Sequence, residues 1–95
     1  MKFFFEVGEQ ERHLIEFQFN QIWGNLSIKV NGEDCIKDFI TASLELVKTY
    51  RFEVGYQERH DIRIDKIRKL FLAGFRKTKY EVYVDGVFFK EYEGR

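Results

Sequence analysis

The two histidines of this 95-residue chain occupy equivalent places in a repeated phrase. The sequence FEVGEQERH at residues 5–13 returns as FEVGYQERH at residues 52–60, with eight of nine positions identical. The phrases end at His13 and His60, side chains that bind metals or exchange protons near neutral pH. The repeat indicates either a building unit used twice or a functional site used twice.

Carboxylates beside the histidines could complete a metal site. These carboxylates are Glu11, Glu58 and Asp61. The sequence has no close ligand spacing such as H-x-x-H, and we expect the two phrases to lie in different sheets. We therefore predict no metal site, and we interpret each histidine as the start of a strand, hydrogen-bonded to neighbouring backbone.

The single cysteine, Cys35, could act as a nucleophile with a histidine as its base. The spacing indicates no Ser-His-Asp or Cys-His-Asn constellation. The equivalent of Cys35 in the second copy is Phe89, an apolar core candidate, so we interpret Cys35 as a small buried hydrophobic residue. We predict no catalytic residue, no cofactor and no enzymatic activity.

A basic segment is the one electrostatic feature that could bind a partner. Residues 63–79 contain seven Lys or Arg and one Asp, in a chain of zero net charge. The candidate binding residues are Arg63, Lys66, Arg68, Lys69, Phe71, Phe75, Arg76, Lys77 and Lys79. Cations interleaved with aromatic residues can bind nucleic acid or anionic lipid. Alternatively, the aromatic residues plug one end of the fold and the cations are solvated.

The elements that position these residues are predicted to be β-strands, because apolar and polar residues alternate with a period of two. The expected strands are 2–8, 12–19, 25–31 and 33–39, then 44–55, 58–66, 77–85 and 87–93. Asn31-Gly32 and Asp85-Gly86 favour type I′ turns, each closing a hairpin. Only residues 35–50 leave room for a short helix.

Two four-stranded meanders, each apolar on one face, predict an all-β fold. We expect a β-sandwich of two antiparallel sheets, built from an internal duplication of residues 2–40 and 47–93 within one domain, 1–95. The predicted core is Phe3, Phe5, Val7, Ile15, Phe17, Leu26, Ile28, Val30, Tyr50, Phe52, Val54, Ile62, Ile64, Val82 and Val84. Phe4 has the opposite parity, so we expect it to be an exposed aromatic residue that could support dimerisation.

The composition limits the classes of function. Apolar residues make up 44% of the chain and suffice for a packed core, while no apolar run reaches the length of a membrane span. The first residues lack the pattern of a secretory signal. A single cysteine fits a reducing cytoplasm. Zero net charge makes the chain a poor candidate for a general nucleic-acid binder.

The ordered set of strand motifs resembles the Fas apoptosis inhibitory molecule family. The stretches that carry the resemblance are HLIEFQF, GNLSIKVNG, YRFEVG and LAGFRKTKYEVYVDGVFFKEYEG, and they span nearly the whole chain, from Phe4 to Gly94. Animal members of the well-known type have two such domains in tandem, and this chain carries one. The resemblance implies a compact β-sandwich of two antiparallel sheets. It also implies a non-enzymatic, cytosolic role through protein contacts: restraint of death-receptor apoptosis and suppression of protein aggregation.

We therefore expect a protein-interaction module whose partner is another protein or an unfolded client. We expect it to be a monomer or a weak homodimer. The alternative is a small domain that binds an anionic ligand or nucleic acid through residues 63–79.

Overall fold

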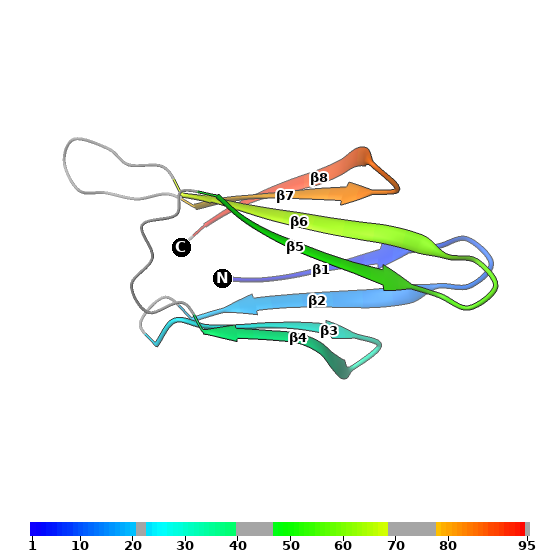
Figure 1. Cartoon of the computed structure of the whole chain (residues 1–95), viewed down its shortest axis with the longest axis horizontal. Coiled ribbons are helices and arrows are strands. Elements are labelled where there is room, and N and C mark those ends of the chain that lie inside the picture. Colours follow the sequence, from blue (N-terminus) through cyan, green and yellow to red (C-terminus); the bar gives the residue numbers. More distant parts are fainter. Residues whose placement is uncertain (21–22, 40–46, 69–77, 95) are drawn as a thin grey trace. The chain divides into compact units, whose positions relative to one another are not determined.

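The computed structural model describes residues 1–20, 23–39, 47–68 and 78–94, and these ranges contain eight β-strands (Figure 1). The strands are β1 (Lys2–Val7), β2 (His13–Phe19), β3 (Asn25–Val30), β4 (Glu33–Phe39), β5 (Val47–Val54), β6 (His60–Arg68), β7 (Thr78–Val84) and β8 (Val87–Gly94). The described ranges contain no helix, and accordingly no helical segment of them is long and apolar enough to cross a membrane.

The strands form two four-stranded sheets in which the neighbours along the chain are also neighbours in the sheet. The first has the order β1-β2-β3-β4 and the second β5-β6-β7-β8 (Figure 1). Antiparallel registers join β1 to β2, β2 to β3, β3 to β4, β6 to β7 and β7 to β8. This topology confirms the all-β class and the two antiparallel sheets of four strands that the β-sandwich prediction requires.

The alternation of the sequence places one face of each sheet in the interior. The buried residues of the first sheet are Phe3, Phe5, Val7, Ile15, Phe17, Phe19, Leu26 and Ile28, and those of the second are Tyr50, Val54, Ile62, Ile64, Tyr80 and Val82. Phe3 stacks on Phe17 with ring centroids 4.7 Å apart. Each such burial is worth about 1.5–3 kcal/mol. Of the predicted core, Val30, Phe52 and Val84 are only half-buried.

The two predicted hairpin turns are confirmed. Asn31 and Gly32 have φ angles of 52° and 83°, and Asp85 and Gly86 have φ angles of 53° and 78°. Positive φ at both central residues is the signature of a type I′ turn, whose twist matches the antiparallel strands beside it. These turns bring β4 and β8 back along the edges of their sheets.

A β-bulge interrupts each of these edge strands, and the burial predicted for Cys35 and Phe89 is overturned there. Along β3 and β4 the register shifts by one residue next to Cys35, which has no opposite partner, and Phe89 is the extra residue between β7 and β8. Cys35 is exposed, and 46% of the surface of Phe89 is exposed. A bulge turns the side chains that follow to the other face. The prediction took Phe89 for a core residue because it is apolar and carried that burial to its equivalent Cys35, and it was wrong at both positions, since the first three residues of each edge strand are exposed.

The described residues cluster into two compact units. The first comprises Met1–Ser43 with Glu53–His60, and the second comprises Leu44–Phe52 with Asp61–Arg95. The second copy of the repeated phrase thus belongs, for the most part, to the unit that contains the first copy. Polar contacts between the two copies therefore lie within the first unit.

Candidate functional site

Each repeated phrase forms a turn between two strands, and the two turns bind each other. We call residues 8–12 the first corner and residues 55–59 the second corner. The carboxylate of Glu58 accepts hydrogen bonds from three backbone N–H groups of the first corner, those of Glu9 (2.9 Å), Gln10 (2.8 Å) and Glu11 (3.4 Å). Three converging amides form a binding site for a carboxylate, and here Glu58 fills it.

The contact is reciprocal. The carboxylate of Glu11 accepts hydrogen bonds from the backbone N–H groups of Tyr56 (2.7 Å) and Gln57 (3.1 Å) in the second corner. Tyr56 and Gln57 correspond to Glu9 and Gln10, and Glu11 corresponds to Glu58, in the alignment of the two phrases. We call this arrangement the corner clasp.

The hydrogen bonds of the clasp stabilise the ionised form of both carboxylates. The pKa of Glu11 is lowered to about 2, chiefly by the backbone amide of Gln57 and then by His13 and the amide of Tyr56. The pKa of Glu58 is also lowered to about 2, chiefly by His60 and then by the amides of Gln10 and Glu9. Both groups are therefore charged at neutral pH.

Two glycines of the phrase are required by the shape of the corners. Gly8 and Gly55 have φ angles of 103° and 97°, a region that residues with a Cβ rarely adopt. A Cβ on Gly8 would lie 2.0 Å from the backbone oxygen of Glu11, and a Cβ on Gly55 would lie 2.0 Å from that of Glu58. The shared glycine of the phrase therefore serves the backbone geometry of each corner, and the shared glutamate at Glu11 and Glu58 serves the clasp.

Each histidine binds the clasp carboxylate of its own corner. Nε2 of His13 lies 2.8 Å from Oε2 of Glu11, and Nε2 of His60 lies 2.6 Å from Oε2 of Glu58. The predicted placement at strand starts is confirmed, since His13 begins β2 and His60 begins β6 in separate sheets. The predicted backbone partner is wrong for His13, because the side chains of Glu11 and Asn31 hold its two ring nitrogens, and for His60 it stays a prediction. The described residues contain no group of three or more His, Cys, Asp or Glu that could hold a metal ion.

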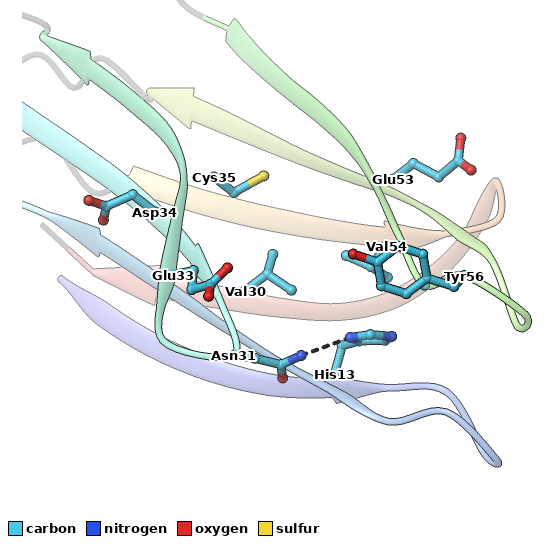
Figure 2. Close-up of a pocket in the computed structure, with 10 residues that line it drawn as sticks. His13, Val30, Asn31, Glu33, Asp34, Cys35, Glu53, Val54 and Tyr56 are labelled. Carbon is cyan, nitrogen blue, oxygen red and sulfur yellow. Dashed lines mark hydrogen bonds between the residues drawn. The ribbon is translucent and has the colours of Figure 1, made fainter.

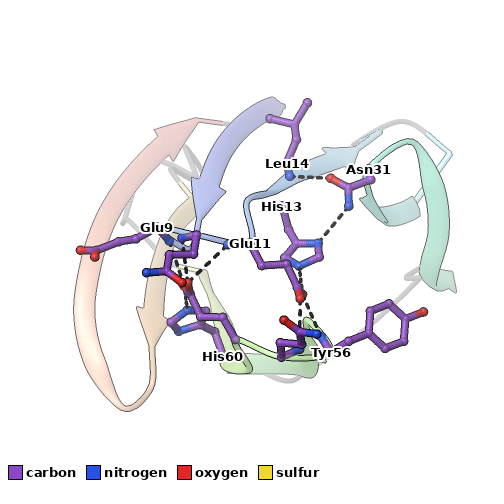
Figure 3. A network of polar contacts seen from close by, with 10 residues as sticks. Glu9, Glu11, His13, Leu14, Asn31, Tyr56 and His60 are labelled. Carbon is purple, nitrogen blue, oxygen red and sulfur yellow. Dashed lines mark hydrogen bonds and ion pairs between the residues drawn. The ribbon is translucent and has the colours of Figure 1, made fainter.

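The second ring nitrogen of His13 is also occupied. Nδ2 of Asn31 donates to Nδ1 of His13 at 2.9 Å, while Oδ1 of Asn31 accepts from the backbone N–H of Leu14 at 2.8 Å (Figure 3). Because Nδ1 accepts, a neutral His13 carries its proton on Nε2 and donates it to Glu11. His13 therefore helps to hold the turn in place. Its only lone pair accepts from Asn31, so it is not directed at a nucleophile as the lone pair of a general base would be.

A pocket of about 530 Å³ lies between the second corner and the β3–β4 hairpin, within the first unit (Figure 2). The residues that line it include His13, Cys35, Val30, Val54, Glu33 and Tyr56. Partial burial raises the pKa of the Cys35 thiol, so the thiol is protonated at neutral pH. The pocket therefore brings Cys35 and His13 to one place without activating either.

Lys66, one of the predicted binding residues of the basic segment, is buried. Lys66 lies in register with Tyr80 on the buried face of its sheet and is 3% exposed. It is therefore neither a solvated cation nor a docking group. The neighbouring Arg68 ends β6 and is half-buried.

The two cations on the outer face already have acidic or aromatic partners. Arg63 stacks over the ring of Tyr83 at 4.0 Å and lies 3.5 Å from Asp65. Lys79 lies 3.1 Å from Glu81 and 2.7 Å from Glu91. The remaining predicted binding residues, Lys69, Phe71, Phe75, Arg76 and Lys77, lie outside the described residues.

The sequence analysis did not predict the exposed apolar residues at the start of β8. Val87, Phe88 and Phe89 open β8 at the edge of the second sheet and are 68%, 55% and 46% exposed. Their equivalents in β4 are the polar or small residues Glu33, Asp34 and Cys35, and this contrast was the available signal. Phe4 is 50% exposed, which confirms its predicted outward position. Its role in dimerisation stays a prediction.

Fold and site together define a small all-β protein with two four-stranded sheets and a corner clasp inside its first compact unit, and the described polar network serves structure. A family model, Fas apoptotic inhibitory molecule (FAIM1), matches residues 7–95. The chain belongs to that family, which confirms the resemblance seen in its strand motifs. No curated protein and no solved structure matches it.

Proposed function

We propose that this chain is a non-enzymatic protein-interaction module that binds exposed apolar segments of other proteins and so protects unfolded clients from aggregation. The proposal is supported by membership of the Fas apoptotic inhibitory molecule family and by the exposed start of β8. Its client is an unfolded or partly unfolded protein. We further propose that it acts in the cytoplasm as a monomer or weak homodimer.

The exposed apolar side chains at the start of β8 carry this proposal. Monomeric proteins rarely leave large contiguous apolar groups in water, and an edge strand offers unpaired backbone groups to an extended chain. Val87, Phe88 and Phe89 are three consecutive exposed apolar residues on such an edge strand. Phe88 is held by an edge-to-face contact with Tyr83, with ring centroids 5.7 Å apart, so this apolar surface has a fixed shape.

A comparison of the two repeats separates structural residues from candidates for recognition. The corner phrases agree at eight of nine positions, and three of the shared residues in each copy, the glycine, the clasp glutamate and the histidine, have structural roles in the corners. At the equivalent starts of β4 and β8, Glu-Asp-Cys stands against Val-Phe-Phe, although both strands form the same bulged edge. The fold therefore accepts polar residues at the start of β8, and we assign its apolar residues to binding.

A non-enzymatic role is supported by the chemistry of the described side chains. His13 uses both ring nitrogens in fixed hydrogen bonds, and the Cys35 thiol has a raised pKa. The alternative function, binding of an anionic ligand or nucleic acid through residues 63–79, finds less support. Arg63 and Lys79 are partnered, and Lys66 is buried.

An aggregation assay tests the proposal. Reduced insulin, whose B chain aggregates, would be followed by light scattering with the wild-type chain and with Phe88→Ser and Phe89→Ser variants. We expect the wild type to delay scattering, and each variant to lose most of that effect. Phe4→Ser removes an equally exposed phenylalanine from the other sheet and should retain protection.

Raised salt distinguishes the two candidate functions. Apolar contacts persist or strengthen in salt, whereas binding to phosphate groups weakens steeply. Full protection by both β8 variants, with native circular dichroism, would overturn the assignment to β8. Salt-sensitive binding of a single-stranded oligonucleotide without protection of insulin would instead favour the alternative.

A further inference from the structure

We propose that the pocket beside the second corner binds a lysine or arginine side chain presented by an extended segment of a partner protein. This site is separate from the β8 surface and goes beyond the function proposed above. Its volume, about 530 Å³, lies within the range of natural ligand sites, roughly 300–1,000 Å³.

The walls of the pocket match a cation that ends an apolar stem. Val30 and Val54 supply an aliphatic surface for the stem, and Glu33 supplies a negative charge. Tyr56 is 88% exposed, and its ring can lie against a cation. Figure 2 shows the Glu33 carboxylate and the Tyr56 ring on either side of Val30. No lysine or arginine is among the lining residues.

The available charge in the pocket is that of Glu33. Asp34 and Glu53 also line the pocket, but Asp34 lies 3.2 Å from Lys37, and Glu53 lies 3.6 Å from Arg59. Within the described part of the chain, Glu33 forms no ion pair. A cation that enters the pocket can therefore bind Glu33 without first breaking an internal pair.

The two repeats show that the fold does not require these two residues. The equivalent of Glu33 is Val87, and the equivalent of Tyr56 is Glu9. The clasp uses the backbone N–H of Tyr56 and leaves its side chain in solvent. At these two positions the pocket has a carboxylate and an aromatic ring, whereas the equivalent positions of the other repeat have a valine and a glutamate.

The arrangement favours an organic cation over a metal ion. The described residues bring no three His, Cys, Asp or Glu side chains together as metal ligands. His13 lines the pocket, but its ring nitrogens are held by Glu11 and Asn31. A guanidinium or ammonium group needs only one carboxylate and one ring face, which Glu33 and Tyr56 provide.

A titration of the full chain tests the site. The probe is the blocked tripeptide acetyl-Gly-Arg-Gly-amide, followed by amide chemical shifts of the isotope-labelled protein. The matched uncharged probe carries citrulline in place of arginine. We expect saturable shifts at residues 30–35 and 53–56, with a Kd of roughly 1–10 mM for this single-side-chain contact, and clearly weaker binding of the citrulline peptide.

Variants identify the two contacts. Glu33→Gln and Tyr56→Ala should each weaken binding about threefold, whereas Tyr56→Phe should retain it. Glu6→Gln is the matched control, because Glu6 is an exposed carboxylate of β1 outside the pocket. Equal binding of the citrulline peptide, shifts elsewhere on the chain, or an equal loss in Glu6→Gln would overturn the proposal. None of these variants alters β8, so the aggregation assay fails or succeeds independently.

Discussion

Glu11 and Glu58 each bind the backbone of the corner that contains the other. Glu58 accepts from the amides of Glu9 and Gln10, and Glu11 accepts from those of Tyr56 and Gln57. Two corners 47 positions apart in the sequence are thereby joined through backbone N–H groups, which every residue other than proline has. Because the donors are backbone amides, the clasp depends on the two carboxylates and on the shape of the turns.

Loss of one clasp carboxylate should expose the opposite corner. In Glu58→Gln, an amide NH₂ replaces one of the oxygens that accept from Glu9 and Gln10, so those donors lose a partner. We expect faster hydrogen exchange at residues 9 and 10 in Glu58→Gln, and at residues 56 and 57 in Glu11→Gln. Glu6→Gln, an exposed carboxylate outside the clasp, should change neither. Faster exchange only beside the substituted residue would contradict a reciprocal clasp.

The clasp also predicts how stability depends on pH. The folded pKa of Glu11 and Glu58 is about 2, below the ordinary value of 4.5. The unfolded chain therefore binds more protons between these values, so the clasp contribution is complete above about pH 4.5 and is lost as the pH falls towards 2. Urea unfolding from pH 6 to pH 2 measures this loss. The Glu11→Gln/Glu58→Gln double variant should show a flatter profile in that window, and an unchanged profile would rule the clasp out as its source.

The corner glycines should resist substitution. In Gly8→Ala the new Cβ would overlap the backbone oxygen of Glu11, and alanine would have to adopt a φ angle of 103°. We expect a loss of more than about 1 kcal/mol in the free energy of unfolding. Gly32→Asn is the control, since a Cβ there meets nothing within 4 Å and asparagine tolerates the left-handed conformation of a turn. Equal stability of the two variants would show that the shape of the corner is not constrained at Gly8.

Local pattern predicted the strands, and it failed where the structure depends on contacts between distant residues. Alternation correctly predicted that Phe17 and Ile28 are buried, and the Asn31-Gly32 pair correctly predicted the hairpin turn. The role of Glu58 could not be read from its neighbours, because its partners are the amides of a turn 47 or more residues away. Cys35 shows a different limit. Its burial was predicted from its apolar equivalent Phe89, but both residues lie on edge strands and are exposed, because an apolar residue type alone does not fix burial.

The exposure of the Cys35 thiol can be tested by chemical labelling. The side chain is exposed, so a maleimide should label Cys35 in the native protein without prior unfolding. Partial burial raises the pKa of this thiol, and the thiolate is the reacting form. At pH 7.5 we therefore expect slower labelling of the native chain than of the chain unfolded in urea, with the difference narrowing as the pH rises above both pKa values. Labelling that occurs only after unfolding would instead indicate the buried cysteine that the equivalence with Phe89 predicts.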